Sequence, residues 1–235
     1  MGGDRAYSFV RGNGKSLYNI PYTLAAHPWI AGETKGCAVI EIIPYQIRWP
    51  EEFAAIGAHL RQLLGRRARR IDHIGSTSVP GLGSKDIIDL QLTLDSFADF
   101  AGQIQAPLEA AGFVLRPHTL ADHRPDDQRS PGTFAYDPEW EKRYLRERPG
   151  DRVLHMHVRV QGRKNQRYAL LFRDYLRAHP QAAAAYQAFK MRLAKLVGDD
   201  RVAYPDTKDP VCDLIIQAAE MWAAATAWTP GPADA

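Results

Sequence analysis

One stretch of the sequence decides the predicted fold: Arg69-Arg-Ile-Asp-His-Ile-Gly-Ser-Thr-Ser-Val-Pro-Gly-Leu-Gly-Ser-Lys-Asp-Ile-Ile-Asp-Leu-Gln-Leu92. Apolar residues gather over 71–74 and 87–94, and residues 75–85 between them are rich in glycine and hydroxyl groups. We therefore predict a strand, a loop and a second strand. Glycine lets a backbone turn with positive φ or approach a ligand closely, and hydroxyl and free N–H groups donate to phosphate oxygens. The loop is thus predicted to bind an anion.

Two charged residues adjoin this loop. Lys85 closes it, and Asp89 lies on the following strand among isoleucine and leucine residues, where a carboxylate is costly to bury unless it is paired or bound to a metal ion. Phosphate donors beside a carboxylate that can hold Mg²⁺ are what nucleotide chemistry requires. Two plainer interpretations stay open, a glycine-rich surface connection and a capping role for Asp89. The loop lacks Gly-x-x-x-x-Gly-Lys-Ser/Thr, and no helix follows it directly, so it is neither a P-loop nor a dinucleotide fingerprint.

A second candidate motif is a histidine pair on a predicted strand over residues 153–160. Because side chains alternate along a strand, His155, His157 and Arg159 share one face. Two histidines at this spacing are suited to binding a metal ion. The alternative is that each histidine is a core residue bonded to a backbone carbonyl. His73, directly before the glycine loop, is a further candidate.

The rest of the chain indicates an α+β fold with a helical C-terminal part. Further strands are predicted over residues 38–43 and 113–115. Apolar residues at helical spacing, with Pro, Ser and Gly at the ends, predict helices over about 49–65, 96–111, 165–177, 180–197 and 210–227. Residues 117–150 are rich in charge, Pro and Gly, so we predict a long loop with a helical turn near 140–145; such loops are often lids or binding loops.

Composition limits the classes of partner. A net charge of +3 over 235 residues suits anionic small molecules and does not indicate a nucleic-acid binder. No apolar run is long enough to cross a membrane, and the first residues do not form a secretory signal. Cys37 and Cys212 form no metal or disulfide pattern, so we expect a cytoplasmic protein.

The chain is divided into three parts on composition. Residues 1–36 form an N-terminal extension with frequent aromatic residues, which we expect to pack across the domain or against a second subunit, leaving a homodimer open. Residues 37–228 form the main domain, and residues 229–235 form a tail.

The chain resembles the GrpB-like family of the nucleotidyltransferase superfamily over about residues 39–224. The resemblance is carried by four groups of residues: Ile43-Pro-Tyr45 with Trp49-Pro50; His73-Ile-Gly-Ser-Thr-Ser-Val-Pro-Gly-Leu82 with Lys85 and Ile87-Ile-Asp-Leu90; Leu154-His-Met-His-Val158; and, in the helical part, Phe172-Arg-Asp-Tyr-Leu-Arg177, Lys190 and Lys208. It implies a nucleotidyltransferase-like mixed β-sheet flanked by helices. It also implies that Gly75 and Ser76 cradle phosphate and that Asp89 is the first metal-binding acid of a site that commonly uses two Mg²⁺ ions.

Three departures from the superfamily pattern bear on activity. Gln91 stands where a second acid is usual, two residues after Asp89 and on the same strand face. The later strand that usually gives the third acid corresponds to the one offering His155 and His157. Asp86 follows Lys85 where the family usually has proline, and we expect it on the opposite strand face from Asp89. One aspartate with two histidines suits a single transition metal better than two Mg²⁺ ions.

The leading hypothesis is a nucleotidyltransferase-like enzyme that binds a nucleoside triphosphate and a divalent metal, Mg²⁺ or Mn²⁺ with a transition metal as the alternative, and modifies a small acceptor. The predicted catalytic residues are Lys85, Asp89, His155 and His157, and the last three are the predicted metal ligands. The predicted phosphate-binding residues are Gly75, Ser76, Thr77, Ser78, Lys85, Arg173 and Lys190. The alternatives are a non-catalytic module that binds a nucleotide or phosphometabolite, and a metal-dependent enzyme of other chemistry in small-molecule biosynthesis.

Overall fold

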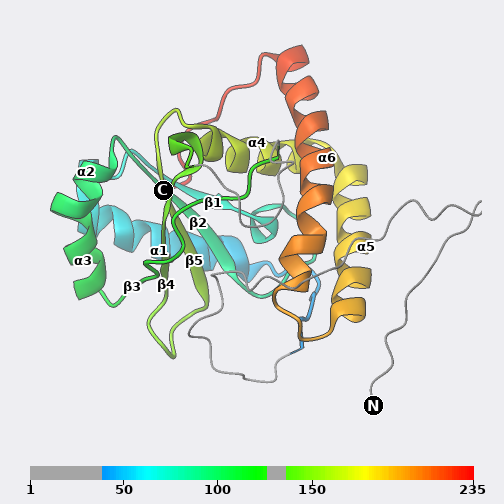
Figure 1. Ribbon diagram of the computed structural model, residues 1–235, viewed down its shortest axis with the longest axis horizontal. Helices are drawn as coiled ribbons and strands as arrows, with labels where there is room; N and C mark the ends of the chain where they lie inside the picture. The colour runs from blue at the N-terminus through cyan, green and yellow to red at the C-terminus, as the bar shows by residue number, and fades with distance from the viewer. Residues whose placement is uncertain (1–38, 126–135) are drawn as a thin grey trace, which may run out of the picture.

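The computed structural model describes residues 39–125 and 136–235, which form one five-stranded sheet flanked by helices (Figure 1). The strand order is β1-β2-β5-β4-β3, and only β2 and β5 are parallel. The strands are β1 Arg70–Ile74, β2 Ile88–Leu94, β3 Val114–Leu115, β4 Arg143–Arg146 and β5 Leu154–Val160. The helices are α1 Arg48–Leu64, α2 Phe97–Asp99, α3 Gln105–Ala110, α4 Lys164–Ala178, α5 Pro180–Val197 and α6 Ala203–Thr226. The predicted α+β fold is confirmed.

The central strands form the core because both of their faces are covered. The apolar residues of β1, β2 and β5 pack with α1 in one cluster that includes the fully buried Trp49, Leu60, Ile88, Leu90 and Leu92. Figure 1 shows α4, α5 and α6 gathered on one side of the molecule, with α2 and α3 on the other. Within the described residues, the helices are too short or too polar to cross a membrane.

Three predicted elements differ from the structure. The expected strand over 38–43 is reduced, within the described residues, to a bridge between Ile43 and Ser84; Pro44 follows at once and has no N–H to extend the pairing. The predicted helical turn near 140–145 is wrong, because a single 3₁₀ turn, Pro138–Trp140, leads into β4, where Leu145 is buried opposite Met156. The last helix begins before Pro210, at Ala203, where the Asp200 side chain accepts from the N–H groups of Val202 and Ala203.

The last residues, 229–235, return to the free edge of β1. Ala235 donates its N–H to the carbonyl of Ile71 at 3.1 Å, and Asp234 accepts from the N–H of His73 and from Arg173 at 2.8 and 2.7 Å. An exposed edge strand offers unpaired backbone groups to other chains, and this segment covers those of β1. It also supports the strand that leads into the glycine loop.

Candidate functional site

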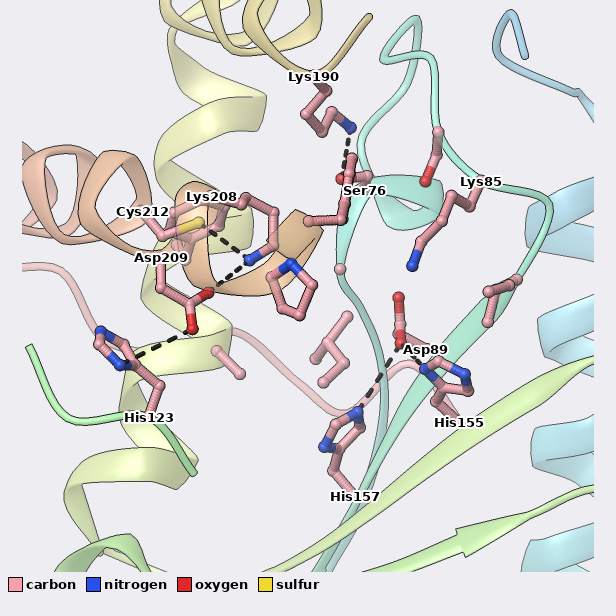
Figure 2. A pocket seen from close by; sticks show the side chains of 18 of the residues that line it. Ser76, Lys85, Asp89, His123, His155, His157, Lys190, Lys208, Asp209 and Cys212 are labelled. Atoms are coloured by element: carbon pink, nitrogen blue, oxygen red, sulfur yellow. Dashed lines mark hydrogen bonds and ion pairs between the residues drawn. The ribbon is translucent and has the colours of Figure 1, made fainter. Parts of the chain in front are cut away.

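A cavity of about 890 Å³ lies between the sheet and the C-terminal helices (Figure 2). The glycine loop and the first residues of β2 and β5 form one wall, and α4, α5 and α6 form another. Seven predicted site residues line it together: Gly75, Ser76, Lys85, Asp89, His155, His157 and Lys190. Three do not line it: Thr77, Ser78 and Arg173.

The shape of the loop depends on Gly75. Its φ is +69°, a value that favours glycine, and a Cβ there would lie 2.5 Å from Oδ2 of Asp89. The next residues form a 3₁₀ turn, Ser76–Ser78, in which Ser78 donates its hydroxyl to the Gly75 carbonyl at 2.6 Å. The Thr77 hydroxyl lies 3.0 Å from Nε2 of His73. Thr77 and Ser78 therefore hold the loop itself, and Ser76 faces the cavity.

Two lysines lie around Ser76. Lys190, which is 3% exposed, donates from Nζ to Oγ of Ser76 at 2.8 Å and to the carbonyl of Gly83 at 2.7 Å. Burial lowers the pKa of Lys190 to about 7. Burial also lowers the pKa of Lys85, although the carboxylate of Asp89 opposes that shift. Lys85 lies with its Nζ 5.1 Å from the ring centre of Tyr204. This part of the cavity presents cationic and hydroxyl donors suited to a phosphate group.

The parallel pairing of β2 with β5 brings the aspartate and the two histidines together. Asp89 pairs with His155 in the register, and one ligand atom from each of the three side chains lies within 4.8 Å of the others. Oδ1 of Asp89 is 3.2 Å from Nδ1 of His155 and 3.8 Å from Nε2 of His157. A carboxylate and two imidazoles at this spacing are a donor set that fits Mn²⁺, Zn²⁺ or Fe²⁺.

The protonation states of this cluster also suit metal binding. Burial by itself raises the pKa of Asp89, but the interactions of its carboxylate with the rings of His155 and His157 outweigh that effect and hold the pKa well below its usual range. Burial lowers the pKa of His157 to about 4, so its ring is neutral near pH 7. An ionised carboxylate and a neutral imidazole are the forms that coordinate metal ions.

Gln91 does not face the cavity. It is fully buried, accepts from Nη1 of Arg159 at 2.6 Å and donates to the carbonyl of Gln166 at 3.2 Å. Its role is therefore to hold Arg159, whose guanidinium in turn donates to Asp122 at 2.8 and 3.0 Å. β2 thus gives the cavity one carboxylate, that of Asp89.

Arg173 and Asp86 serve the fold in the structure. Arg173 is 3% exposed and donates to Asp234, to Asp174 and to the carbonyl of His73, behind the loop. The prediction that Asp86 lies on the same strand as Asp89, on its opposite face, is wrong, because β2 begins only at Ile88. Its carboxylate accepts from Arg48, Trp49 and Arg152, which fixes the entry to the strand at the rim of the cavity.

Several lining residues escaped sequence reasoning. Asp122 accepts from Arg159, Lys142 and Asn165, and its Oδ1 lies 4.0 Å from Nδ1 of His157. It belongs to the charged 117–150 loop, whose sequence has no period that would single it out. The strand alternation of β4 could have indicated Tyr144, whose ring lies against the rings of His155 and His157. His123, Asp209 and Cys212 also line the cavity.

The fold and the site define an α+β domain with a large cavity that combines a Gly-Ser loop with an aspartate–histidine cluster. A family model described as GrpB protein matches residues 39–218, most of the chain. The chain therefore belongs to the GrpB family, as the sequence resemblance predicted.

One solved structure agrees with this assignment, whereas the curated relatives carry other names. A dephospho-CoA kinase of Mycolicibacterium paratuberculosis is 36% identical over 200 residues, 82% of this chain and 49% of that protein. The UPF0157 protein YqkA of Bacillus subtilis is 30% identical over 78% of this chain and 48% of its own. This chain thus spans about half the length of these curated relatives. The crystal structure of the conserved protein GrpB from Enterococcus faecalis matches with a TM-score of 0.62 and 28% identity, covering 77% of this chain and 99% of that one.

Two glycines of the loop allow a matched test of the contact with Asp89. Gly75→Ala should displace the Asp89 carboxylate and weaken binding of Mn²⁺ by at least about tenfold, a loss of about 1.4 kcal/mol. Gly81→Ala is the control: Gly81 also has positive φ, +81°, but a Cβ there meets nothing within 4 Å. Both variants carry backbone strain, and Gly75→Ala alone should lose metal affinity in calorimetry. Equal Mn²⁺ affinities would contradict the proposed role of the contact.

Lys190 gives a prediction on stability against pH. Its pKa is about 7 in the folded protein and about 10.4 in an unfolded chain, so the unfolded state binds the extra proton between these values. The stability of the wild type relative to Lys190→Met should therefore rise with pH from about 7 to about 10, by up to ~1.4 kcal/mol per pH unit. Urea denaturation of both proteins across this pH range measures the difference in their free energies of unfolding. If that difference does not change with pH, burial does not lower the pKa of Lys190.

Proposed function

We propose that this protein is a metal-dependent transferase of the nucleotidyltransferase type, which binds a nucleoside triphosphate and modifies a small acceptor. The observation that supports it is one cavity that holds both the Gly75–Ser76 loop with its lysines and the cluster of Asp89, His155 and His157. Displacement at phosphorus requires positioned cations against the charge of the phosphates and the leaving group. The cavity provides lysine side chains beside the loop and, next to them, a cluster of side chains that could hold a metal cation.

The residues of the loop have separable roles in this proposal. Because Ser76 accepts from Lys190, its hydroxyl proton is available to donate to a phosphate oxygen. In its protonated form, which a bound phosphate anion favours, Lys190 uses two of its three N–H groups on Ser76 and Gly83 and keeps one for the ligand. The positive charge of Lys85 interacts favourably with the negative charge of the Asp89 carboxylate.

Asp89, His155 and His157 would hold the metal ion. A divalent ion bound there would polarise phosphoryl oxygens and neutralise charge on the leaving group. Two imidazoles favour Mn²⁺ or another transition metal over Mg²⁺, which prefers oxygen ligands.

The kinase name of some relatives sets no substrate for this chain. Those proteins are about twice the length of the matched region. The Gly-x-x-x-x-Gly-Lys-Ser/Thr motif of P-loop kinases is absent from this sequence. The proposal therefore depends on the site alone.

One observation favours a second candidate, a non-catalytic module that binds a nucleotide or phosphometabolite. Two-metal transferases use two or more carboxylates, whereas the residue two positions after Asp89 is Gln91, held in the core by Arg159 and Gln166. Such a module would keep the phosphate cradle and lack turnover.

The experiment that tests the proposal is a calorimetric titration of ATP, CTP, GTP and UTP in the presence of Mn²⁺ or Mg²⁺. At least one should bind, and its binding should require the metal. If none of the four binds with either metal, the proposed function is wrong.

Substitution of Asp89 separates the enzyme from the binding module. Asp89→Ala should lower kcat about 100-fold or more, the effect of removing one preorganised charge-stabilising group, measured by release of label from the α-labelled nucleotide that binds. Asp95→Ala is the matched control, since Asp95 follows the same strand and is mostly exposed. A wild type that binds nucleotide without any turnover, and an Asp89→Ala variant of equal affinity, would support the binding module instead.

A further inference from the structure

The wall of the cavity formed by α6 and the 117–125 loop carries a histidine that the proposed phosphate and metal sites do not use. His123 lines the cavity with a 40% exposed side chain, and Figure 2 shows it across from Asp89. Two aspartates of α6 lie against its ring. Nε2 is 2.9 Å from both carboxylate oxygens of Asp213, and Nδ1 is 3.8 Å from Oδ2 of Asp209.

These contacts fix how the neutral ring is protonated. A carboxylate can only accept hydrogen bonds, so the nitrogen that faces Asp213 at hydrogen-bonding distance carries the proton. Nδ1 is then the nitrogen with a free lone pair. Its distance to Asp209 is too long for a hydrogen bond, and Asp209 is itself held by Nζ of Lys208 at 2.8 Å. A histidine in a cavity, oriented by a carboxylate and with one nitrogen open, is the arrangement of a general base.

A second observation on the same cavity points to a ligand that donates hydrogen bonds. The amide of Asn165 donates from Nδ2 to Asp122 at 3.1 Å and to the carbonyl of Glu141 at 2.9 Å. Both partners are acceptors, so the amide cannot be turned around. Its Oδ1 is left buried without a donor among the described residues, although Asn165 is only 1% exposed and lines the cavity. A buried acceptor without a donor is unfavourable, and a ligand with N–H or O–H groups would supply one.

We propose that this wall binds the acceptor substrate, a small alcohol or amine, and that Nδ1 of His123 takes its proton while Asp213 orients the ring. The inference depends on the proposed function and names the acceptor side of that site. The acceptor oxygen or nitrogen forms a bond to the α-phosphorus, and the bond from that phosphorus to the pyrophosphate oxygen breaks. Pyrophosphate leaves with the bonding electron pair, and the proton of the acceptor passes to His123.

The test uses the full chain with Mn²⁺ and the α-labelled nucleotide that binds. Water, 1,2-ethanediol and 1,2-diaminoethane are offered as acceptors, so that the two probes separate an alcohol from an amine. His123→Gly should lower kcat about 100-fold or more with unchanged nucleotide affinity by calorimetry, and added imidazole should restore part of the rate. His118→Gln, an exposed histidine of the same loop, should keep the wild-type rate.

The outcomes are separable from those of the proposed function. If no nucleotide binds, the proposed function fails and the inference fails with it. If nucleotide binds but the wild type transfers label to none of the acceptors, the assignment of His123 is overturned and the binding module is supported. If the wild type transfers label but His123→Gly keeps the wild-type rate, or imidazole restores nothing, only the assignment of His123 is overturned. Nitrogen NMR of the histidine rings gives a readout without turnover: near neutral pH the proton should be on Nε2 of His123, and a proton on Nδ1 would overturn the proposal.

Discussion

The contact between the backbone of Gly75 and the carboxylate of Asp89 is the constraint on which the site depends. The antiparallel register of β1 and β2 places Ile74 opposite Asp89, so the residue that follows Ile74 must turn away directly over that carboxylate. Only a residue without a Cβ, at positive φ, fits there. The turn then directs Ser76 into the cavity, and it leaves Asp89 facing the histidines of β5.

Buried polar networks hold this arrangement from two sides. Behind the loop, Arg173 ties Asp234 of the C-terminal segment to the carbonyl of His73. Further along β2, on the same face as Asp89, Gln91 accepts a hydrogen bond from Arg159, which binds Asp122 near His157. Buried ionic groups are costly unless they are fully paired. These pairs therefore specify where the sheet, the glycine loop and residues 117–125 meet, and the lysines and the aspartate–histidine cluster face the cavity.

Much of the fold and part of the site could be predicted from the sequence. The alternation of residues 153–160 put His155 and His157 on one face, and the resemblance tied them to Asp89. The number of hydroxyl groups in the loop does not show which of them form hydrogen bonds that hold the turn. The hydroxyls of Thr77 and Ser78 do so, and they are therefore not directed at a ligand. A buried arginine on a helix looks like any other arginine in sequence, so Arg173 was assigned to phosphate. His123 and Asp122 lie in a segment without periodicity, and only tertiary contacts bring them to the cavity.

The most direct test of the account is a crystal structure with Mn²⁺ and a non-hydrolysable nucleoside triphosphate, with the metal located by its anomalous scattering. The account predicts a peak about 2.0–2.3 Å from an oxygen of Asp89 and from a ring nitrogen of each of His155 and His157, with a phosphate oxygen beside Oγ of Ser76. A metal bound away from these three side chains, or a triphosphate bound elsewhere than at the Gly75–Ser76 loop, would contradict it.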